Sequence, residues 1–164
     1  MKYCFRVGLY YQGLMHDLSK YCPEEFITGV KYYQGGNRSS NNGERDVIGY
    51  SKAWLHHQGR NKHHYEYWID YNSRNDGDVM VPIKMPLKYV VEMFLDRIAA
   101  SRIYNKGSYT DDMPLKYYAY SANRIPMHKE TKALLYGLLR MLEVYGEDKT
   151  LNFIKRRLLK YDTY

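Results

Sequence analysis

The spacing of hydrophobic and polar positions predicts helices along most of the chain. In residues 86–104, PLKYVVEMFLDRIAASRIY, apolar side chains recur at helical spacing as Val91, Phe94, Leu95 and Ile98. Pro86 suits the first turn of this helix, as a proline does at the start of a second predicted helix, residues 23–33. The same reasoning predicts helices at 46–58, 114–122, 128–145 and 147–160.

Polar segments rich in Gly, Asn and Ser separate these helices. Residues 34–46, 72–78 and 105–112 have no apolar period and are predicted loops. The segment YEYWIDY, residues 65–71, fits a helix or a strand equally well. Residues 2–11 resemble the remainder of a helix that Gly13 interrupts before residues 14–21 resume the pattern. With no internal repeat and no linker, the chain is expected to form one all-α helical domain over residues 1–164.

Composition adds a preference for anionic partners. The chain is 45% hydrophobic, which suffices for a core, and 20 tyrosines dominate its aromatic content. A formal charge of +7 favours nucleotides, phosphates, nucleic acid or acidic proteins as partners. The alternative is an ordinary basic surface that binds nothing acidic.

Other features indicate a cytoplasmic protein. No apolar run approaches the ~18 residues that a membrane helix needs, and no secretory leader is evident. Cys4 and Cys22 do not form the pattern of a disulfide scaffold. We therefore expect reduced thiols and no membrane contact, while the oligomeric state stays open.

The first chemical signal is HDLSK, residues 16–20. Imidazole and carboxylate together suit borderline divalent metals. Consecutive helical residues point about 100° apart, so His16 and Asp17 could reach one ion only if a helix end or packing turns both inward. Lys20, one turn later, could contact a substrate phosphate. Alone, such a pair is more often an ordinary surface feature.

The second signal is WLHHQGRNKHHYEYW, residues 54–68, which holds four of the six histidines. His57 shares a helical face with Trp54 and is expected to be half-buried, which favours it over His56 as a metal ligand. The pattern does not decide whether His63 or His64 is the next metal ligand, and we select His64. Arg60 and Asn61 are candidate phosphate contacts, because arginine grips phosphate oxygens in pairs.

A third signal is Asp96, which lies within the apolar helix of residues 86–104. A carboxylate close to a core stripe needs a compensating charge, which a metal could supply. Arg97 or Arg102 could supply it instead, and Arg97 is also a candidate for neutralising a substrate phosphate. Glu92, four residues earlier, neighbours Asp96 on a helix face.

In this order, the adjacent His-Asp, the histidine segment and the distant Asp resemble the HD superfamily of metal-dependent phosphohydrolases, which has an all-α fold. HDLSK resembles the central pair of that family with its frequent lysine, Asp96 resembles its final aspartate, and HHQGRNKHH resembles the extra histidines of two-metal members such as HD-GYP phosphodiesterases. The resemblance implies that His16, Asp17, His57, His64 and Asp96 bind metal. The metal would be Mn, Fe, Co, Ni, Zn or Mg.

A narrower resemblance covers nearly the whole chain. HDLSK followed by PEEF, the segment AWLHHQGRNKHHYEYW and MPLKYVVEMFLDRIAAS are similar to motifs of an uncharacterised family of small bacterial and phage proteins. The first metal histidine of the HD superfamily would lie before position 16, yet residues 1–15 contain none. We expect either that an N-terminal helix is lacking or that the site uses a different donor set.

These features predict a metal-dependent phosphohydrolase acting on a nucleotide or another phosphate ester. Asp17 would orient or deprotonate the attacking water, and Lys20 would assist at the phosphate. The alternative is a non-catalytic binding protein on an HD-like scaffold, with a protein or nucleic-acid partner, for instance in phage interference with a host.

Overall fold

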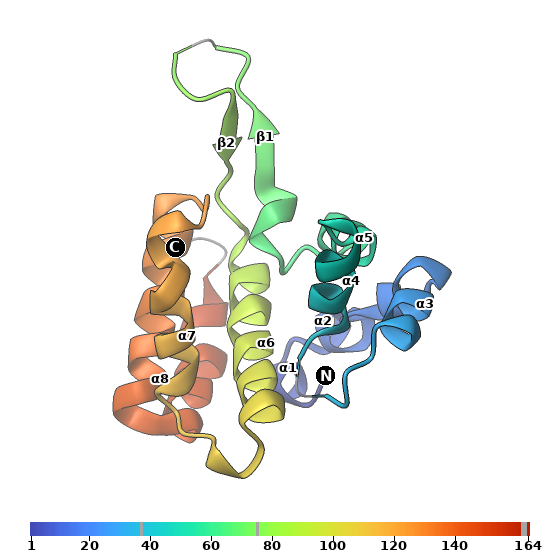
Figure 1. Ribbon diagram of the computed structural model, residues 1–164. Helices are drawn as coiled ribbons and strands as arrows, with labels where there is room; N and C mark the ends of the chain where they lie inside the picture. The colour runs from blue at the N-terminus through green and yellow to red at the C-terminus, as the bar shows by residue number, and fades with distance from the viewer. Residues whose placement is uncertain (37, 75, 162–163) are drawn as a thin grey trace.

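Helix α6, Leu87–Asn105, lies at the centre of the molecule. The computed structural model describes residues 1–36, 38–74, 76–161 and 164. Figure 1 shows α6 between the C-terminal helices on one side and the N-terminal helices on the other. The apolar stripe predicted for this helix is fully buried, with Phe94 and Ile98 at 0% exposure. The core therefore forms around α6, because its side chains meet neighbours on both sides.

The C-terminal side of α6 is covered by α7, Met113–Ser121, and α8, Lys129–Arg156. Short 3-10 turns, η3, η4 and η5, cover Lys106–Ser108, Ala122–Arg124 and Leu158–Lys160. The backbone of Gly146 (φ 79°, ψ 171°) interrupts α8. This is where the sequence predicts one helix to end at 145 and the next to begin at 147, because glycine adopts positive φ without steric cost.

The N-terminal side of α6 is covered by a series of short helices. In chain order these are α1, Lys2–Val7; α2, Tyr10–Met15; the 3-10 turn η1, Leu18–Tyr21; α3, Pro23–Lys31; α4, Ser40–Ile48; and α5, Lys52–Arg60. The expected break at Gly13 is wrong. The chain breaks at Gly8 (φ 89°), while Gly13 lies inside α2 so close to the Phe5 ring that a Cβ would be 2.6 Å from it.

Two further predictions on this side are also wrong. The loop predicted at 34–46 contains most of α4, whose N-terminus is capped by the Ser39 hydroxyl; position 37 lies outside the described residues. The single helix predicted at 46–58 is divided by Gly49 (φ 82°) into the end of α4 and a separate α5. Ser51 accepts a hydrogen bond from the Trp54 N–H at 3.0 Å and donates to Glu44, so α5 has its own N-cap.

A small hairpin joins the two sides and projects from the body (Figure 1). The undecided segment 65–71 is half helical and half extended. It forms the 3-10 turn η2, Tyr65–Trp68, and strand β1, Ile69–Tyr71, which pairs antiparallel with β2, Met80–Pro82. The expected loop at 72–78 connects these strands, with position 75 outside the described residues.

The prediction of an all-α class is confirmed in the form of a mostly helical chain with one two-stranded sheet. Within the described ranges no helix is both long and apolar enough to cross a membrane. Cys4 and Cys22 are free thiols. The site described next lies where the N-terminal helices meet α6.

Candidate metal centre

His16 and Asp17 lie in a turn rather than within a helix. Helix α2 ends at Met15, and Asp17 adopts the left-handed conformation (φ 58°) before η1 begins. Aspartate tolerates this region better than most residues, although the conformation costs free energy of order 1–3 kcal/mol. The turn lets both side chains face inward, with His16 Nε2 3.5 Å from Asp17 Oδ2.

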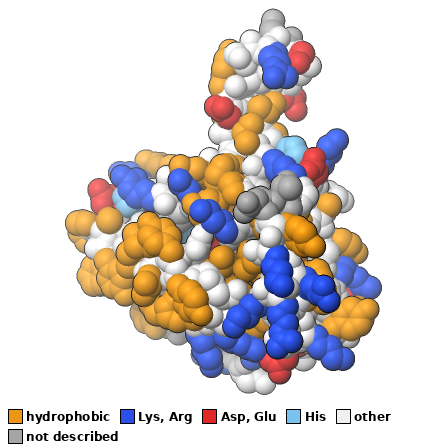
Figure 2. Space-filling model, turned by 180° about the vertical axis from the view of Figure 1, so that it is seen from behind, with side chains coloured by type: hydrophobic (Ala, Val, Ile, Leu, Met, Phe, Trp, Pro, Cys, Tyr) orange, Lys and Arg blue, Asp and Glu red, His pale blue; other side chains and the backbone are white. Residues whose placement is uncertain are grey.

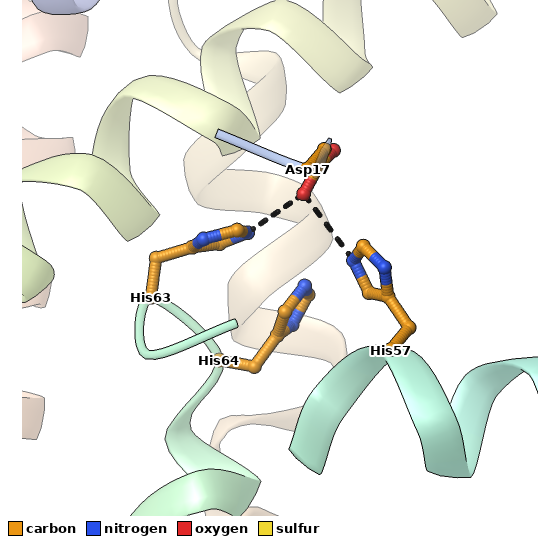
Figure 3. A group of neighbouring side chains, drawn as sticks. All are labelled: Asp17, His57, His63 and His64. Atoms are coloured by element: carbon orange, nitrogen blue, oxygen red, sulfur yellow. Dashed lines mark ion pairs between the residues drawn. The ribbon is translucent and has the colours of Figure 1, made fainter. Parts of the chain in front are cut away.

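Asp17 and three histidines converge on one point. Figure 3 shows Asp17 facing His57 from α5 and the adjacent pair His63 and His64 from the segment after it. Asp17 Oδ1 lies 3.4 Å from His57 Nε2 and 3.5 Å from His63 Nε2. One donor atom from each of the four residues lies within 4.8 Å of the others. We call these residues the first donor group.

A second donor group adjoins the first. His16, His63 and Asp96 each offer an atom within 4.8 Å of the other two, and His16 Nε2 lies 3.5 Å from Asp96 Oδ1. His63 belongs to both groups. The two oxygens of Asp17 also face different groups, since Oδ1 approaches His57 and His63 while Oδ2 approaches His16. The centre is therefore continuous from α5 to α6.

The atoms present fit a divalent metal. Asp17 Oδ1, His63 Nε2 and His64 Nε2 are buried and have no hydrogen-bond partner among the described residues. Unpaired buried polar atoms cost free energy, and a single cation would satisfy all three. Tetrahedral ligands about 2.0–2.1 Å from a metal lie about 3.3 Å apart, close to the 3.4–3.5 Å separations from Asp17 Oδ1. Imidazole nitrogen and carboxylate oxygen suit Mn, Fe, Co, Ni or Zn.

Glu92 lies behind two of the histidines. Its Oε1 accepts a hydrogen bond from His16 Nδ1 at 2.9 Å and lies 3.2 Å from His63 Nδ1. A carboxylate at Nδ1 fixes the tautomer in which Nε2 carries the free lone pair, as metal-binding histidines require. Glu92 and Asp96 are one turn apart on α6, so the helix presents a donor and a supporting carboxylate on the same side.

Glu25 of α3 supports the site in the same way. It is 8% exposed, and its two oxygens lie 2.7 Å from His56 Nδ1 and 2.8 Å from His57 Nδ1. Only His57 then directs Nε2 toward Asp17. The structure thus places His57 in the donor group and His56 beside it.

Two histidines of the site, His64 and His16, differ in their pKa. Burial and the neighbouring His63 and His57 lower the pKa of His64 to about 3, so its imidazole is neutral and its lone pair is available. Burial would also lower the pKa of His16, but hydrogen bonding to Asp96 and Glu92 raises it to about 9. In metal-free protein at neutral pH, His16 therefore carries a proton that a cation must displace.

Two cationic side chains neighbour donor residues, Lys20 through an ion pair with Asp17 and Arg97 as the residue that follows Asp96 in the chain. Lys20 Nζ is 2.5 Å from Asp17 Oδ2, and this side chain is 61% exposed. Arg97 is different, because its Nε is buried without a hydrogen-bond partner and its guanidinium lies 5.5 Å from the centre of the Tyr118 ring. Within the described ranges no carboxylate forms an ion pair with Arg97.

The remaining two substrate-contact candidates differ from each other. Arg60 is exposed at the end of α5, so it can meet only a ligand that reaches the rim of the centre. Asn61 is 7% exposed, and its amide donates to Ser19 Oγ at 2.7 Å and to the His57 carbonyl at 2.8 Å. These bonds tie η1 to α5, and so connect the turn that carries Asp17 with the helix that carries His57.

Sequence reasoning left His63 undecided and assigned no role to Glu92 or Glu25. The structure brings His63 and His64 together, because their segment leaves α5 through a turn in which the rings of consecutive residues lie 4.3 Å apart. The four-residue spacing of Glu92 and Asp96 places both carboxylates on one face of the helix, which is a signal for the role of Glu92. No comparable signal marked Glu25, since its acidic neighbour Glu24 occupies the same helix N-terminus and is exposed.

Comparison with known proteins gives one family. The model of the family of unknown function DUF5662 matches residues 1–141. This confirms the resemblance to an uncharacterised family, whereas the relationship to the HD superfamily stays a prediction. No curated protein and no solved structure matches the chain.

Proposed function

The chain belongs to DUF5662, a family of unknown function, and we propose that it is a metal-dependent phosphohydrolase acting on a nucleotide or another phosphate ester. The observation that carries this proposal is the set of buried, unpaired donor atoms on Asp17, His63 and His64. These unpaired donors can hold a cation, and Lys20, which pairs with Asp17, lies beside them where it can meet an anion.

The donor residues can be assigned to one or two metal ions. His57, His63, His64 and Asp17 would hold one divalent ion, and His16, His63 and Asp96 would complete that site or hold a second ion. A bound divalent metal supplies Lewis acidity to phosphoryl oxygens and lowers the pKa of its water toward neutrality. This set includes His63 in addition to the predicted residues, which supports the expectation that the site uses a different donor set from that of the HD superfamily.

The side chains around the donors supply substrate contacts and proton handling. The pKa of Asp17 is lowered, against the effect of burial, by Lys20 and His16, so its carboxylate is charged and can accept a proton or orient water. Lys20 reaches from Asp17 toward solvent, where its remaining N–H groups can donate to a phosphate. The Arg97 guanidinium has no acidic partner among the described residues, so it can donate paired hydrogen bonds to phosphate oxygens.

The experiment is a hydrolysis assay on chelated protein reloaded with each metal in turn, which measures both released phosphate and opened phosphodiester products. Nucleotides, cyclic dinucleotides and sugar phosphates form the substrate panel, and turnover is expected only with metal present. Arg97→Gln should lower kcat/KM for the active substrate while metal content stays at the wild-type level. The matched control is Arg140→Gln, which alters an exposed arginine paired with Glu143 and should change neither quantity.

The enzyme proposal fails if protein that retains metal hydrolyses no substrate of the panel with any of the metals. The chain would then be a non-catalytic protein that holds metal, which is the alternative that its sequence allows. An Arg97→Gln enzyme with unchanged kcat/KM would remove Arg97 from the phosphate contacts without affecting the metal assignment.

A further inference from the structure

Helix α3 has its polar side buried and its apolar side exposed. Glu25 and Thr28 face the interior at 8% and 9% exposure. Phe26, Ile27 and Val30, on the opposite side, are 57%, 62% and 65% exposed. A surface helix normally turns its apolar stripe to the core. In α3 the interior position is taken by the carboxylate that supports His57, so the apolar stripe is left without a partner in the described chain.

Neighbouring elements extend this surface. Tyr11 and Leu14 of α2 are 70% and 58% exposed, and Tyr21 at the end of η1 is 80% exposed. Figure 2 shows hydrophobic side chains gathered on the side of the molecule that α1, α2 and α3 form. We call the six residues Tyr11, Leu14, Tyr21, Phe26, Ile27 and Val30 the apolar face.

The area of this face is that of a protein interface. Aromatic side chains bury about 150–250 Å² each and aliphatic ones less, so six side chains that are 57–80% exposed offer roughly 800 Å². The largest apolar patch on a typical monomer is about 300–600 Å², whereas one side of a stable interface buries about 800 Å². The apolar face therefore exceeds what a monomer ordinarily exposes and suffices for a dimer.

The charge of the face indicates what covers it. Between residues 10 and 33 the exposed charged side chains are Lys20, Glu24 and Lys31, a nearly balanced set in a chain of net charge +7. The excess positive charge thus lies elsewhere, so the face does not concentrate the attraction that draws basic helices to anionic lipid. Tyrosine- and phenylalanine-rich surface with few charges is typical of the centre of a protein–protein interface.

We propose that the apolar face is the interface of a homodimer, in which α2 and α3 of one copy pack against the same elements of a second copy. A nearly uncharged face can meet itself across a two-fold axis without bringing like charges together. This inference does not depend on the proposed function. A dimer would also explain why α3 turns its polar side inward. Phe26, Ile27 and Val30 would be buried between the two copies, while Glu25 faces His57.

The test is the molar mass of the full chain in solution, measured by sedimentation or light scattering across micromolar concentrations. Wild-type protein is expected to be dimeric. Ile27→Asp should have half that mass, because a buried unpaired charge opposes association. The matched control is Ile103→Asp, which alters an isoleucine that is 65% exposed at the far end of α6 and should leave the dimer intact.

Circular dichroism accompanies each measurement, and Val30→Asp replaces Ile27→Asp if the latter loses helical signal. A wild-type monomer throughout the concentration range would overturn the proposal. So would a dimer that persists in both α3 variants, because its interface would lie elsewhere. Monomeric protein that floats with anionic vesicles would instead identify lipid as the occupant of the face.

Discussion

The His63→Ala variant is expected to lose metal binding almost completely. His63 contributes to both donor groups, so its removal leaves neither with a full set. Its Nε2 is 3.5 Å from Asp17 Oδ1, and its Nδ1 is 3.2 Å from Glu92. We expect affinity for Mn²⁺, Co²⁺ or Zn²⁺ to fall by more than the roughly 10–100-fold typical of losing an outer partner. Phosphate release should fall with it.

The matched control for this experiment is His56→Ala. His56 also bonds a buried carboxylate, at 2.7 Å from Glu25, but offers no atom to either donor group. Its metal affinity should stay near the wild-type value. Titration calorimetry or competition with a chromophoric chelator measures both variants. Equal metal affinity in His63→Ala and wild type, with helical content unchanged, would show that the centre does not use His63.

Glu92→Gln is expected to weaken metal binding without removing any ligand. The substitution keeps the shape of the side chain but removes the charge that fixes the His16 and His63 tautomers. Loss of such an outer carboxylate typically lowers metal affinity by about 10–100-fold. The effect should appear in the same titrations, with the stoichiometry of binding preserved.

A purely structural role of Glu92 would give a different result. Glu147→Gln is the comparison, because Glu147 is a carboxylate held by Arg102 at 2.7 Å and by Tyr3 at 3.0 Å. It forms no ion pair with any histidine among the described residues. Both variants are expected to lower thermal stability, but only Glu92→Gln should lower metal affinity. If both variants bind metal as the wild type does, Glu92 is a core carboxylate rather than a partner of the metal ligands.

Helical periodicity predicts the position of the central helix α6 but not the ends of the short N-terminal helices. The stripe Val91, Phe94, Leu95 and Ile98 predicted α6 because these residues bury a continuous face. The short helices were misplaced where glycine conformation decides their ends. Gly8, Gly13 and Gly49 look alike in sequence, yet only Gly8 and Gly49 adopt positive φ, because Gly13 is needed for close contact with Phe5.

The sequence likewise predicts some residues of the candidate site and misses others. Residue type and order predict five metal ligands, and the structure brings all five into the two donor groups, namely His16, Asp17, His57, His64 and Asp96. That they bind metal stays a prediction. Glu25 could not be assigned, since its role depends on α3 packing with its polar side against α5. The sequence also does not predict the side-chain directions of His63 and His64, because these depend on a turn that brings consecutive residues to one centre.

The most direct test of the account is the metal content of protein that has been loaded with divalent metal and then dialysed. Elemental analysis should find at least one tightly held ion per wild-type chain and a marked loss in Asp17→Asn, because Asp17 faces both donor groups. Stoichiometric metal in the wild type that is lost from the variant is the predicted result. A wild-type chain that retains no metal, or a variant that retains as much, would contradict the assignment of this cluster as a metal centre.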